Sequence, residues 1–355
     1  MKAVVLVGGE GTRLRPLTYD LPKPMVPICG KPFMQYQLEL MKDHGIDEVI
    51  FSLGYKSSAF EEYFGDGAGF GMKIHYIVED SPLGTAGAIK NVEHLLDDSS
   101  FLVFNGDILS RMNLTEIMNF HKEKKSACTI VLTPVDDPTM YGVVELDSNS
   151  GIVNFTEKPK KEEVRSNLIN AGLYILEPGI LKRMEPARKY SIEREIFPAM
   201  LADKEPMFGY SYSGYWMDIG TPFKYLSSNH DTLTGKMPVD LNHREGIVYG
   251  KNTDISTNAV LTAPLWIGDN VIIKSGAKIE GPAVIDRGCI IGEKTKISGA
   301  LLWEKTKTGN GCILDSCLIG RDCNLGDNVK IGKLAVIGSC NIIEKDRIIE
   351  AETCI

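Results

Sequence analysis

The chain has 355 residues and a formal net charge of −8, with 43% apolar and 24% charged residues. An acidic chain is a poor nucleic-acid binder, because affinity for a phosphate backbone requires an excess of Lys and Arg. The apolar runs are too short for a bilayer span or a signal peptide, so we expect a cytoplasmic protein without a membrane partner. The length exceeds what one hydrophobic core usually serves, which predicts two domains.

The chain begins with a predicted strand, Lys2–Val7, that leads directly into a glycine-rich turn. The turn reads G-G-E-G-T-R-L-R-P-L-T over Gly8–Thr18. It does not match the dinucleotide fingerprint G-x-G-x-x-G, because Leu14 stands where the third glycine is required, and it is not a P-loop. Glycines let backbone N–H groups surround phosphate oxygens, and Arg13 and Arg15 can bind them. We therefore predict a phosphate-binding loop.

A lysine between two prolines follows at Pro22-Lys23-Pro24. Proline on both sides stiffens the backbone that carries the ammonium group. Lys23, Arg13, Arg15 and Lys31 form the densest basic cluster of this part of the chain. This pattern places Lys23 in the same predicted phosphate site.

Residues 1–235 alternate short β-branched runs with amphipathic stretches, which predicts a mostly parallel α/β sheet with helices on both faces. In such sheets, ligands bind at the carboxyl ends of the strands. The further predicted strands are Glu48–Leu53, Lys73–Val78, Phe101–Asn105 and Ala127–Thr133, and the predicted helices are Phe33–Asp43, Ala59–Phe64, Thr85–Leu96 and Leu114–Lys124.

The carboxy-terminal region has a different period. Aliphatic residues recur every six positions from Ile267 to Ile297, and again from Ile313 to Ile343. This is the hexapeptide signature of a parallel β-helix, whose aliphatic residues stack inside triangular coils. We interpret Gly299–Gly311, between the two series, as a protruding loop or a misshapen coil. The predicted organisation is a domain at 1–235, a linker at 236–250 and a β-helix at 251–355.

The cysteines of the tail follow the same period. Cys289, Cys317 and Cys323 each stand four residues after a predicted interior aliphatic, where a compact side chain fits. The chain has no C-x-x-C pair of the kind that zinc sites use. We predict that these cysteines pack in the interior of the β-helix.

Three amino-terminal motifs carry a family resemblance: the loop Gly8–Thr18, P-K-P-M-V-P from Pro22, and G-K-P from Gly30. Together they resemble the sugar-nucleotide pyrophosphorylases, and the resemblance extends over nearly the whole chain. With the hexapeptide tail, the chain most resembles the GDP-mannose pyrophosphorylase branch, the mannose-1-phosphate guanylyltransferases. The resemblance implies a Rossmann-like, GT-A-like nucleotidyltransferase domain followed by a left-handed parallel β-helix.

The implied reaction joins GTP to mannose 1-phosphate and releases pyrophosphate. A sugar-phosphate oxygen attacks the α-phosphorus, so the protein must position the substrates and neutralise charge, usually with a divalent metal. Asp107 and Asp218 are hard oxygen donors of the kind that Mg²⁺ prefers, and the resemblance makes both of them metal ligands. It makes Arg13, Lys23 and Asp107 catalytic. The structural alternatives are a turn aspartate at Asp107 and a salt bridge at Asp218.

The resemblance also implies two binding sets. The nucleotide set is Gly8, Gly9, Gly11, Thr12, Arg13, Lys23, Glu79, Gly84 and Thr85. The sugar-phosphate set is Gly142, Glu157, Lys158, Asn170 and Asp218. An ordinary exposed turn at Glu157 and Lys158, and a loop-capping role for Asn170, are the alternative interpretations.

The choice of base depends on Glu79, which follows the predicted strand Lys73–Val78. Guanine presents two adjacent donors, N1–H and N2–H, and one carboxylate can accept both. Relatives that use thymidine or uridine triphosphate tend to have Gln at this point, so Glu79 favours guanine. A solvated acid beside Asp80 is the alternative. We expect Glu10, at a variable position of the loop, to point away from the triphosphate.

Other functions are open to the same sequence. Within the enzyme class the alternative is a glucose-1-phosphate thymidylyl-, uridylyl- or adenylyltransferase. A hexapeptide acyltransferase generally needs a histidine base, and no histidine follows His243. A non-catalytic nucleotide-sugar sensor can lose its catalytic charges, whereas this chain keeps them. Because a solenoid exposes strand edges and flat faces, we expect a homo-oligomer formed through the β-helix.

Overall fold

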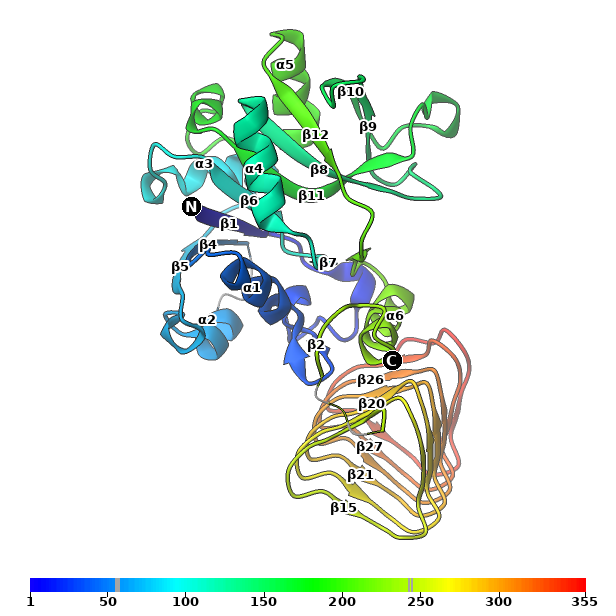
Figure 1. Cartoon of the computed structure of the whole chain (residues 1–355). Helices are drawn as coiled ribbons and strands as arrows, with labels where there is room; N and C mark the ends of the chain where they lie inside the picture. The colour runs from blue at the N-terminus through cyan, green and yellow to red at the C-terminus, as the bar shows by residue number, and fades with distance from the viewer. Residues whose placement is uncertain (55–57, 242, 244) are drawn as a thin grey trace. The chain divides into compact units, whose positions relative to one another are not determined.

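A computed structural model describes residues 1–54, 58–241, 243 and 245–355 (Figure 1). Contacts divide the chain into two compact units. One unit contains Met1–Glu10 and Tyr36–Trp216, and the other contains Gly11–Gln35 and Met217–Ile355. The larger part of the predicted phosphate-binding loop thus groups with the carboxy-terminal region. The predicted linker 236–250 includes residues 242 and 244, which lie outside the described residues.

The first unit is built on a mixed sheet in which the strand order is β10-β9-β11-β6-β1-β4-β5, and β8 joins β11 to β12. Strands β6, β1, β4 and β5 run parallel, whereas β11 is antiparallel to β6 and β8. The strands are β1 (Lys2–Val7), β4 (Glu48–Leu53), β5 (Lys73–Val78), β6 (Phe101–Asn105), β8 (Cys128–Pro134), β9 (Gly142–Leu146), β10 (Ile152–Glu157), β11 (Leu168–Leu176) and β12 (Met207–Ser211). β-Branched and aromatic residues fill them, as expected for a sheet with a buried core.

Helices pack against this sheet, with α3 on β1, α4 on β8 and β12, and α5 on β10. Their bounds, with those of the neighbouring helices, are α1 (Phe33–Asp43), α2 (Ser58–Phe64), α3 (Gly84–Asn91), α4 (Leu114–Lys124) and α5 (Phe197–Ala202). Most predicted strands and helices are confirmed to within one residue. The predicted helix Thr85–Leu96 is too long: α3 ends at Asn91, and a 3₁₀ turn, η4 (Glu93–Leu95), follows. None of the helices in the described ranges is long and apolar enough to cross a membrane.

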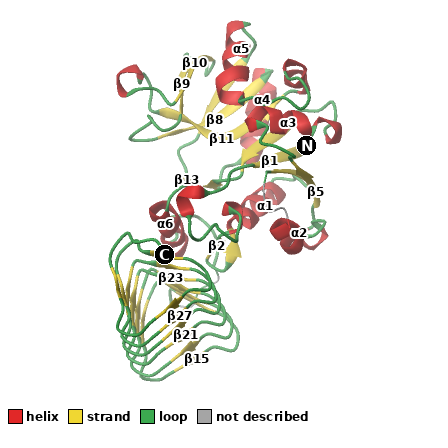
Figure 2. Cartoon of the chain, turned by 180° about the vertical axis from the view of Figure 1, so that it is seen from behind, coloured by secondary structure: helices red, strands yellow, loops and turns green. Residues whose placement is uncertain are grey.

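The second unit contains helix α6 (Pro222–Leu233) and a left-handed parallel β-helix with three parallel sheets (Figure 2). The first sheet is β14 (Ile247–Tyr249), β17 (Leu265–Ile267), β20 (Ala283–Ile285), β23 (Leu301–Leu302), β26 (Leu318–Ile319) and β29 (Val336–Ile337). The second is β15 (Asp254–Ile255), β18 (Ile272–Ile273), β21 (Ile290–Ile291), β24 (Lys307–Thr308), β27 (Asn324–Leu325) and β30 (Ile342–Ile343). The third is β16 (Val260–Thr262), β19 (Lys278–Glu280), β22 (Lys296–Ser298), β25 (Ile313–Asp315), β28 (Lys330–Ile331) and β31 (Ile348–Ile349).

The break in the hexapeptide period is a shortened coil, and no loop protrudes there. Leu265 pairs with Ala283, 18 residues along the chain, but Val284 pairs with Leu301, which is 17 residues along. Each residue that is missing from a coil moves the interior positions after it one residue earlier in the sequence. Leu314 is therefore interior at 1% exposed, while Ile313 is 40% exposed. The expectation that Ile313 faces inward is wrong.

The predicted interior cysteines are confirmed. Cys289, Cys317 and Cys323 are buried and unpaired. Burial raises the pKa of Cys317 to about 12 and that of Cys323 to about 11, so both thiols stay protonated near neutral pH. Among the described residues, no group of three or more His, Cys, Asp and Glu side chains is placed to hold a metal ion.

Both the inner and the outer face of the first β-helix sheet are apolar. The outward residues of the third sheet include Lys278, Lys296 and Lys330, which are exposed. In contrast, the corresponding residues of β20, β23, β26 and β29 are buried: Val284, Leu301, Leu318 and Val336. Helix α6 packs against β20. The outer face of this sheet is therefore covered by other parts of the same unit, and α6 is one of them.

Polar contacts fix that cover in place. The hydroxyl of Tyr225, in α6, accepts a hydrogen bond from Trp303 Nε1 at 2.9 Å and donates one to the carbonyl of Pro27. The Cys29 N–H donates to Asn229 Oδ1 at 3.0 Å. Asp20 and Arg321 form an ion pair at 2.7 Å. The segment that carries Arg13 and Lys23 is thus anchored to α6 and the β-helix.

We predict that Leu314→Ala lowers the free energy of unfolding by about 2–5 kcal/mol, because it leaves a cavity among stacked aliphatic residues. The matched substitution Ile313→Ala should change it by less than about 1 kcal/mol, because that side chain is largely solvated. Guanidinium denaturation followed by circular dichroism measures both values. Equal losses in the two variants would contradict the register of the shortened coil.

Candidate active site

The predicted site residues divide between the two units. The first unit holds Gly8, Gly9, Glu79, Gly84, Thr85, Asp107, Gly142, Glu157, Lys158 and Asn170. The second holds Gly11, Thr12, Arg13, Lys23 and Asp218.

In the first unit, three predicted residues follow the carboxyl ends of neighbouring parallel strands. Gly8 follows β1, Glu79 follows β5, and Asp107 lies two residues after β6. Two glycines let the backbones approach closely at this edge. A Cβ on Gly54 would lie 3.0 Å from the Gly8 backbone, and a Cβ on Gly106 would lie 2.7 Å from the Leu6 carbonyl oxygen.

The turn that carries Asp107 is held by a side chain that the sequence analysis missed. The buried amide of Gln37, in α1, donates from Nε2 to the carbonyls of Asn105 and Ile108, one on each side of Asp107. Gln37 Oε1 and Asn105 Oδ1 are buried and have no hydrogen-bond donor. Sequence reasoning had no signal for Gln37, because a glutamine on a helix is usually solvated.

Glu79 already accepts two hydrogen bonds from the protein. Its Oε1 accepts from Ser52 Oγ at 3.1 Å, and its Oε2 accepts from the Leu83 N–H at 2.9 Å. Glu79 is therefore a fixed carboxylate that holds Leu83, the cap of α3, and with it the Leu83–Gly87 segment that forms the first turn of this helix. This excludes the alternative of a freely solvated acid.

The Leu83–Gly87 loop packs tightly against the segment 188–193. The Tyr190 N–H donates to Leu83 O at 2.9 Å, and the Ala86 N–H donates to Tyr190 O at 3.1 Å. A Cβ on Gly84, where φ is +70°, would lie 2.4 Å from Tyr190 O, and one on Gly87 would lie 2.7 Å from Arg188 O. The two glycines are thus required by this contact.

Four residues of the sugar-phosphate set lie in the first unit, on or directly after β9, β10 and β11. Gly142 is paired with Glu157 across β9 and β10, and a Cβ on Gly142 would lie 2.6 Å from Phe155 and 2.9 Å from Glu157 Oε2. Lys158 follows with a left-handed φ of +51°, and its N–H donates to Tyr141 O at 2.9 Å. Burial, and secondarily the charge of Glu193, raises the pKa of Glu157.

Asn170 lies at an irregularity of β11, where the pairing with β8 shifts register. Its Oδ1 accepts from the Gly172 N–H at 2.9 Å, and its Nδ2 donates to the hydroxyl of Tyr174 at 2.6 Å. The local capping expected of a structural asparagine is therefore present. Trp216 Nε1 donates to Ala171 O at 2.9 Å, which fixes the next residue as well.

In the second unit, the phosphate-binding loop turns at Gly11. Its φ is +62°, and a Cβ there would lie 3.0 Å from the Cβ of Lys23. Thr18 Oγ1 donates to Gly11 O at 2.8 Å and closes the loop. Arg13 lies in a 3₁₀ turn, η1 (Thr12–Leu14), and is exposed. The structure therefore brings Gly11 and Lys23 together, as phosphate binding by both requires.

Asp218 of the second unit lies beside two cations. It forms an ion pair with Lys224. A Cβ on Gly220 would lie 3.0 Å from Arg13 Nη2 and 3.1 Å from Asp218 Oδ2, so glycine leaves room for both side chains. The ion pair that sequence reasoning set out as the alternative for Asp218 is present.

Several features of these residues fit a divalent cation. Asp107 and Asp218 are carboxylates, which are the hard oxygen donors that such ions take. The buried, donor-free Asn105 Oδ1 lies on the turn that carries Asp107. A cation bound by Asp107 would supply charge neutralisation at the phosphates. A cation bound by Asp218 would have to share that carboxylate with Lys224.

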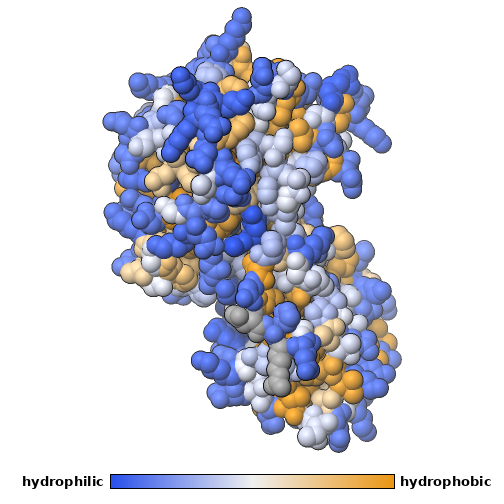
Figure 3. All heavy atoms as spheres, in the orientation of Figure 1, coloured by the Kyte–Doolittle hydropathy of each residue, from blue (hydrophilic) through white to orange (hydrophobic). Residues whose placement is uncertain are grey.

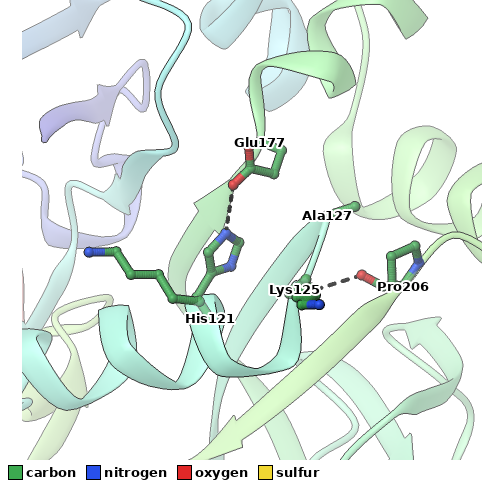
Figure 4. Close-up of a pocket in the computed structure, with 7 residues that line it drawn as sticks. His121, Lys125, Ala127, Glu177 and Pro206 are labelled. Carbon is green, nitrogen blue, oxygen red and sulfur yellow. Dashed lines mark hydrogen bonds and ion pairs between the residues drawn. The ribbon is translucent and has the colours of Figure 1, made fainter.

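A cavity of about 440 Å³ lies elsewhere in the first unit, beside the end of α4 (Figure 4). His121 bridges Thr129 Oγ1 at 2.8 Å and Glu177 Oε1 at 3.1 Å there, and burial lowers the pKa of His121. Lys122 and Lys125 flank it at the carboxyl end of the helix, where free carbonyls favour cations and disfavour anionic ligands. None of the predicted site residues lines this cavity.

A mixed α/β sheet with a glycine–arginine loop after its first strand, followed by a hexapeptide β-helix, defines a sugar-nucleotide-forming class of nucleotidyltransferases. Residues 2–235 match the family model described as "Nucleotidyl transferase", and residues 247–355 match "GMPPB C-terminal domain". The chain belongs to the nucleotidyl transferase family and is an enzyme of that class. Enzymes of this family generally use a divalent metal.

Individual relatives differ in the substrates that their names state. Mannose-1-phosphate guanylyltransferase of Mycobacterium tuberculosis is 38% identical over 88% of this chain and 82% of its own length. UTP--glucose-1-phosphate uridylyltransferase of Synechocystis sp. is 32% identical over 91% of this chain and 88% of its own length. The crystal structure of HddC from Yersinia pseudotuberculosis complexed with GMP-PN is 32% identical, with a TM-score of 0.56, and covers 65% of this chain and 99% of that chain.

Proposed function

We propose that the protein is a mannose-1-phosphate guanylyltransferase, which forms GDP-mannose from GTP and mannose 1-phosphate and releases pyrophosphate. The observation that carries the base assignment is Glu79, a carboxylate held at a strand end by Ser52 and Leu83. Guanine alone among the common bases presents two adjacent N–H donors to such an acceptor. The name of the Mycobacterium relative and the GMP-PN bound to HddC support the same base. Since both substrates are metabolites of the cytoplasm, we place the reaction there.

The residues of both units serve one reaction in this proposal. Gly8, Gly9, Gly11 and Thr12 bind the triphosphate through the backbone, while Arg13 and Lys23 neutralise the charge that develops at the α-phosphorus. Asp107 of the first unit and Asp218 of the second would each offer a carboxylate ligand to Mg²⁺, which neutralises phosphate charge when bound. The set assigned to the sugar phosphate orients the attacking oxygen, with Lys158 on the phosphate and Glu157 on sugar hydroxyls. This last set is Gly142, Glu157, Lys158, Asn170 and Asp218.

The second candidate within the class uses another pair of substrates. The similarity to the Synechocystis uridylyltransferase favours glucose 1-phosphate with uridine triphosphate. A panel that measures pyrophosphate release from four triphosphates, each with mannose and glucose 1-phosphate, separates the two. We expect GTP with mannose 1-phosphate to give the highest kcat/KM. If another pair is used and this one fails, the specificity proposal is wrong; if no pair releases pyrophosphate, the sensor alternative replaces it.

We predict that Asp107→Asn and Arg13→Ala each lower kcat by about 100-fold or more, because each removes a charge that acts on the transferring phosphate. Asp98→Asn, an exposed carboxyl outside the site, is the matched control and should keep the wild-type rate. Steady-state kinetics and a thermal melt of each variant are the measurements. A folded variant with wild-type kcat would remove that residue from the catalytic set.

We also propose that the protein assembles into a homo-oligomer through the β-helix. Apolar residues stand among hydrophilic ones over the β-helix face drawn in Figure 3. Several outward aliphatic residues of the β-helix are exposed, among them Val260, Ile313, Ile342 and Ile348. Burying such residues against a second copy would be favourable.

Light scattering should therefore give a mass that is a multiple of the 39.1 kDa chain. Combining Ile342→Lys with Ile348→Lys should move the mass toward a single chain, because buried lysines oppose the contact. A wild-type monomer at micromolar concentration would contradict the proposed assembly.

A further inference from the structure

Glu193 lies on a short helical turn whose backbone is fixed at its start. The turn, η7 (Ile192–Ile196), is a π-helix, a geometry that is rare and often found at functional sites. Ser191 caps it, because its Oγ accepts from the Arg194 N–H at 3.2 Å. The Ser191 N–H in turn donates to Glu195 Oε1 at 2.9 Å. Glu193 therefore presents its carboxylate from a rigid element.

One carboxylate oxygen of Glu193 is bound to the loop assigned to the nucleotide. Thr85 Oγ1 donates to Glu193 Oε2 at 2.7 Å, and the same hydroxyl accepts from the Ile192 N–H at 2.8 Å. Ser191 Oγ donates to Glu193 Oε2 at 2.8 Å. The Thr85 hydroxyl thus makes its hydrogen bonds within the protein, and it fixes the position of the segment that carries Thr85.

The other oxygen faces the residues assigned to the sugar phosphate. Tyr174, which is fully buried, donates its hydroxyl to Glu193 Oε1 at 3.5 Å. The same hydroxyl accepts from Asn170 Nδ2 at 2.6 Å. A single carboxylate therefore connects Thr85 with Asn170 through one tyrosine.

The direction of these hydrogen bonds requires a carboxylate. The Asn170 amide can only donate from Nδ2, so the Tyr174 hydroxyl accepts there and donates onward. Thr85 and Ser191 also donate to Glu193, which leaves Glu193 as an acceptor of three hydroxyl groups. A glutamine of the same shape has one accepting oxygen and a donating NH₂, and would leave at least one of these hydroxyls without an acceptor.

We propose that Glu193 is a positioning residue that holds the nucleotide loop at Thr85 and the sugar-phosphate residue Asn170 in one arrangement. This inference rests on the proposed function, since it takes the two binding sets from it. It adds that one carboxylate supports both halves of the first unit's site, each through its own hydrogen bond. The effect of Glu193 on the pKa of Glu157 shows that its charge also reaches the sugar-phosphate side.

Three near-isosteric variants test the connection link by link. Thr85→Val removes the nucleotide-side link and should raise KM for the triphosphate about tenfold, as the loss of a hydrogen bond to a charged group predicts. Tyr174→Phe removes the other link and should raise KM for the sugar phosphate by a similar factor. Glu193→Gln should raise both. The variants are measured with the pair that the wild-type enzyme uses, together with the affinity of each substrate alone by calorimetry.

Glu195→Gln is the matched control, because Glu195 lies on the same turn and the glutamine keeps an oxygen for the Ser191 N–H. It should leave both KM values within about twofold, as a surface substitution usually does. A purely structural role for Glu193 would lower the melting temperature and leave both affinities unchanged, which would overturn the proposal. If Glu193→Gln does not fold, the other two variants still decide: each must act on its own substrate, and equal effects on both substrates would overturn it. A wild-type protein without turnover would instead reject the proposed function.

Discussion

The second unit depends on the burial of one outward row of the β-helix. On a solenoid, outward side chains normally meet water, and the row of Lys278, Lys296 and Lys330 does so. The row of Val284, Leu301, Leu318 and Val336 is apolar and buried. Burying each such side chain contributes about 1.5–3 kcal/mol, so the row contributes on the order of 10 kcal/mol as an upper estimate. That is comparable to the net stability of a whole domain.

Polar contacts anchor the predicted phosphate-binding loop within this same apolar unit. Nonpolar burial is strong but has little directionality, whereas hydrogen bonds contribute less energy and fix geometry. The bonds from Tyr225 to Pro27 and from Cys29 to Asn229 supply that geometry. They hold the segment between Gly11 and Gln35, which carries Arg13 and Lys23. The β-helix thus supports the segment with the proposed catalytic residues, which the sequence places at the opposite end of the chain.

Sequence reasoning succeeded where a residue type has one dominant local consequence. β-Branched runs located the parallel strands almost to the residue. The six-residue period predicted the β-helix but gave the wrong side for Ile313. One residue missing from a coil corner changes which later positions face inward, and no local sequence pattern indicates the missing residue. Adjacent apolar residues such as Val284-Ile285 and Leu318-Ile319 occur in the covered sheet, but Ile290-Ile291 repeats the pattern in another sheet, so such pairs do not identify the covered face.

The residues that position the site could not be predicted in the same way. Gln37, Tyr174 and Glu193 belong to types that are common at ordinary helix and strand positions. Their roles arise from partners that are distant in sequence, such as Thr85 for Glu193 and Asn105 for Gln37. Only the folded backbone creates those pairs. The glycines of the Leu83–Gly87 loop have the same character, because the chain segment that requires them lies about a hundred residues away.

In the proposed function, Glu79 makes the geometry of the Leu83–Gly87 turn and the choice of base two results of one interaction. A carboxylate has about four lone-pair sites, and Ser52 and Leu83 occupy two of them. The remaining lone pairs belong to a side chain that has already lost its rotational freedom. A base that binds there would therefore meet a preorganised hydrogen-bond acceptor. Guanine satisfies it with two donors, whereas uracil and thymine would set carbonyl oxygens beside it, and an unmatched buried acceptor costs about 1–3 kcal/mol. The residue that fixes the loop is therefore also able to discriminate between bases by one to two orders of magnitude.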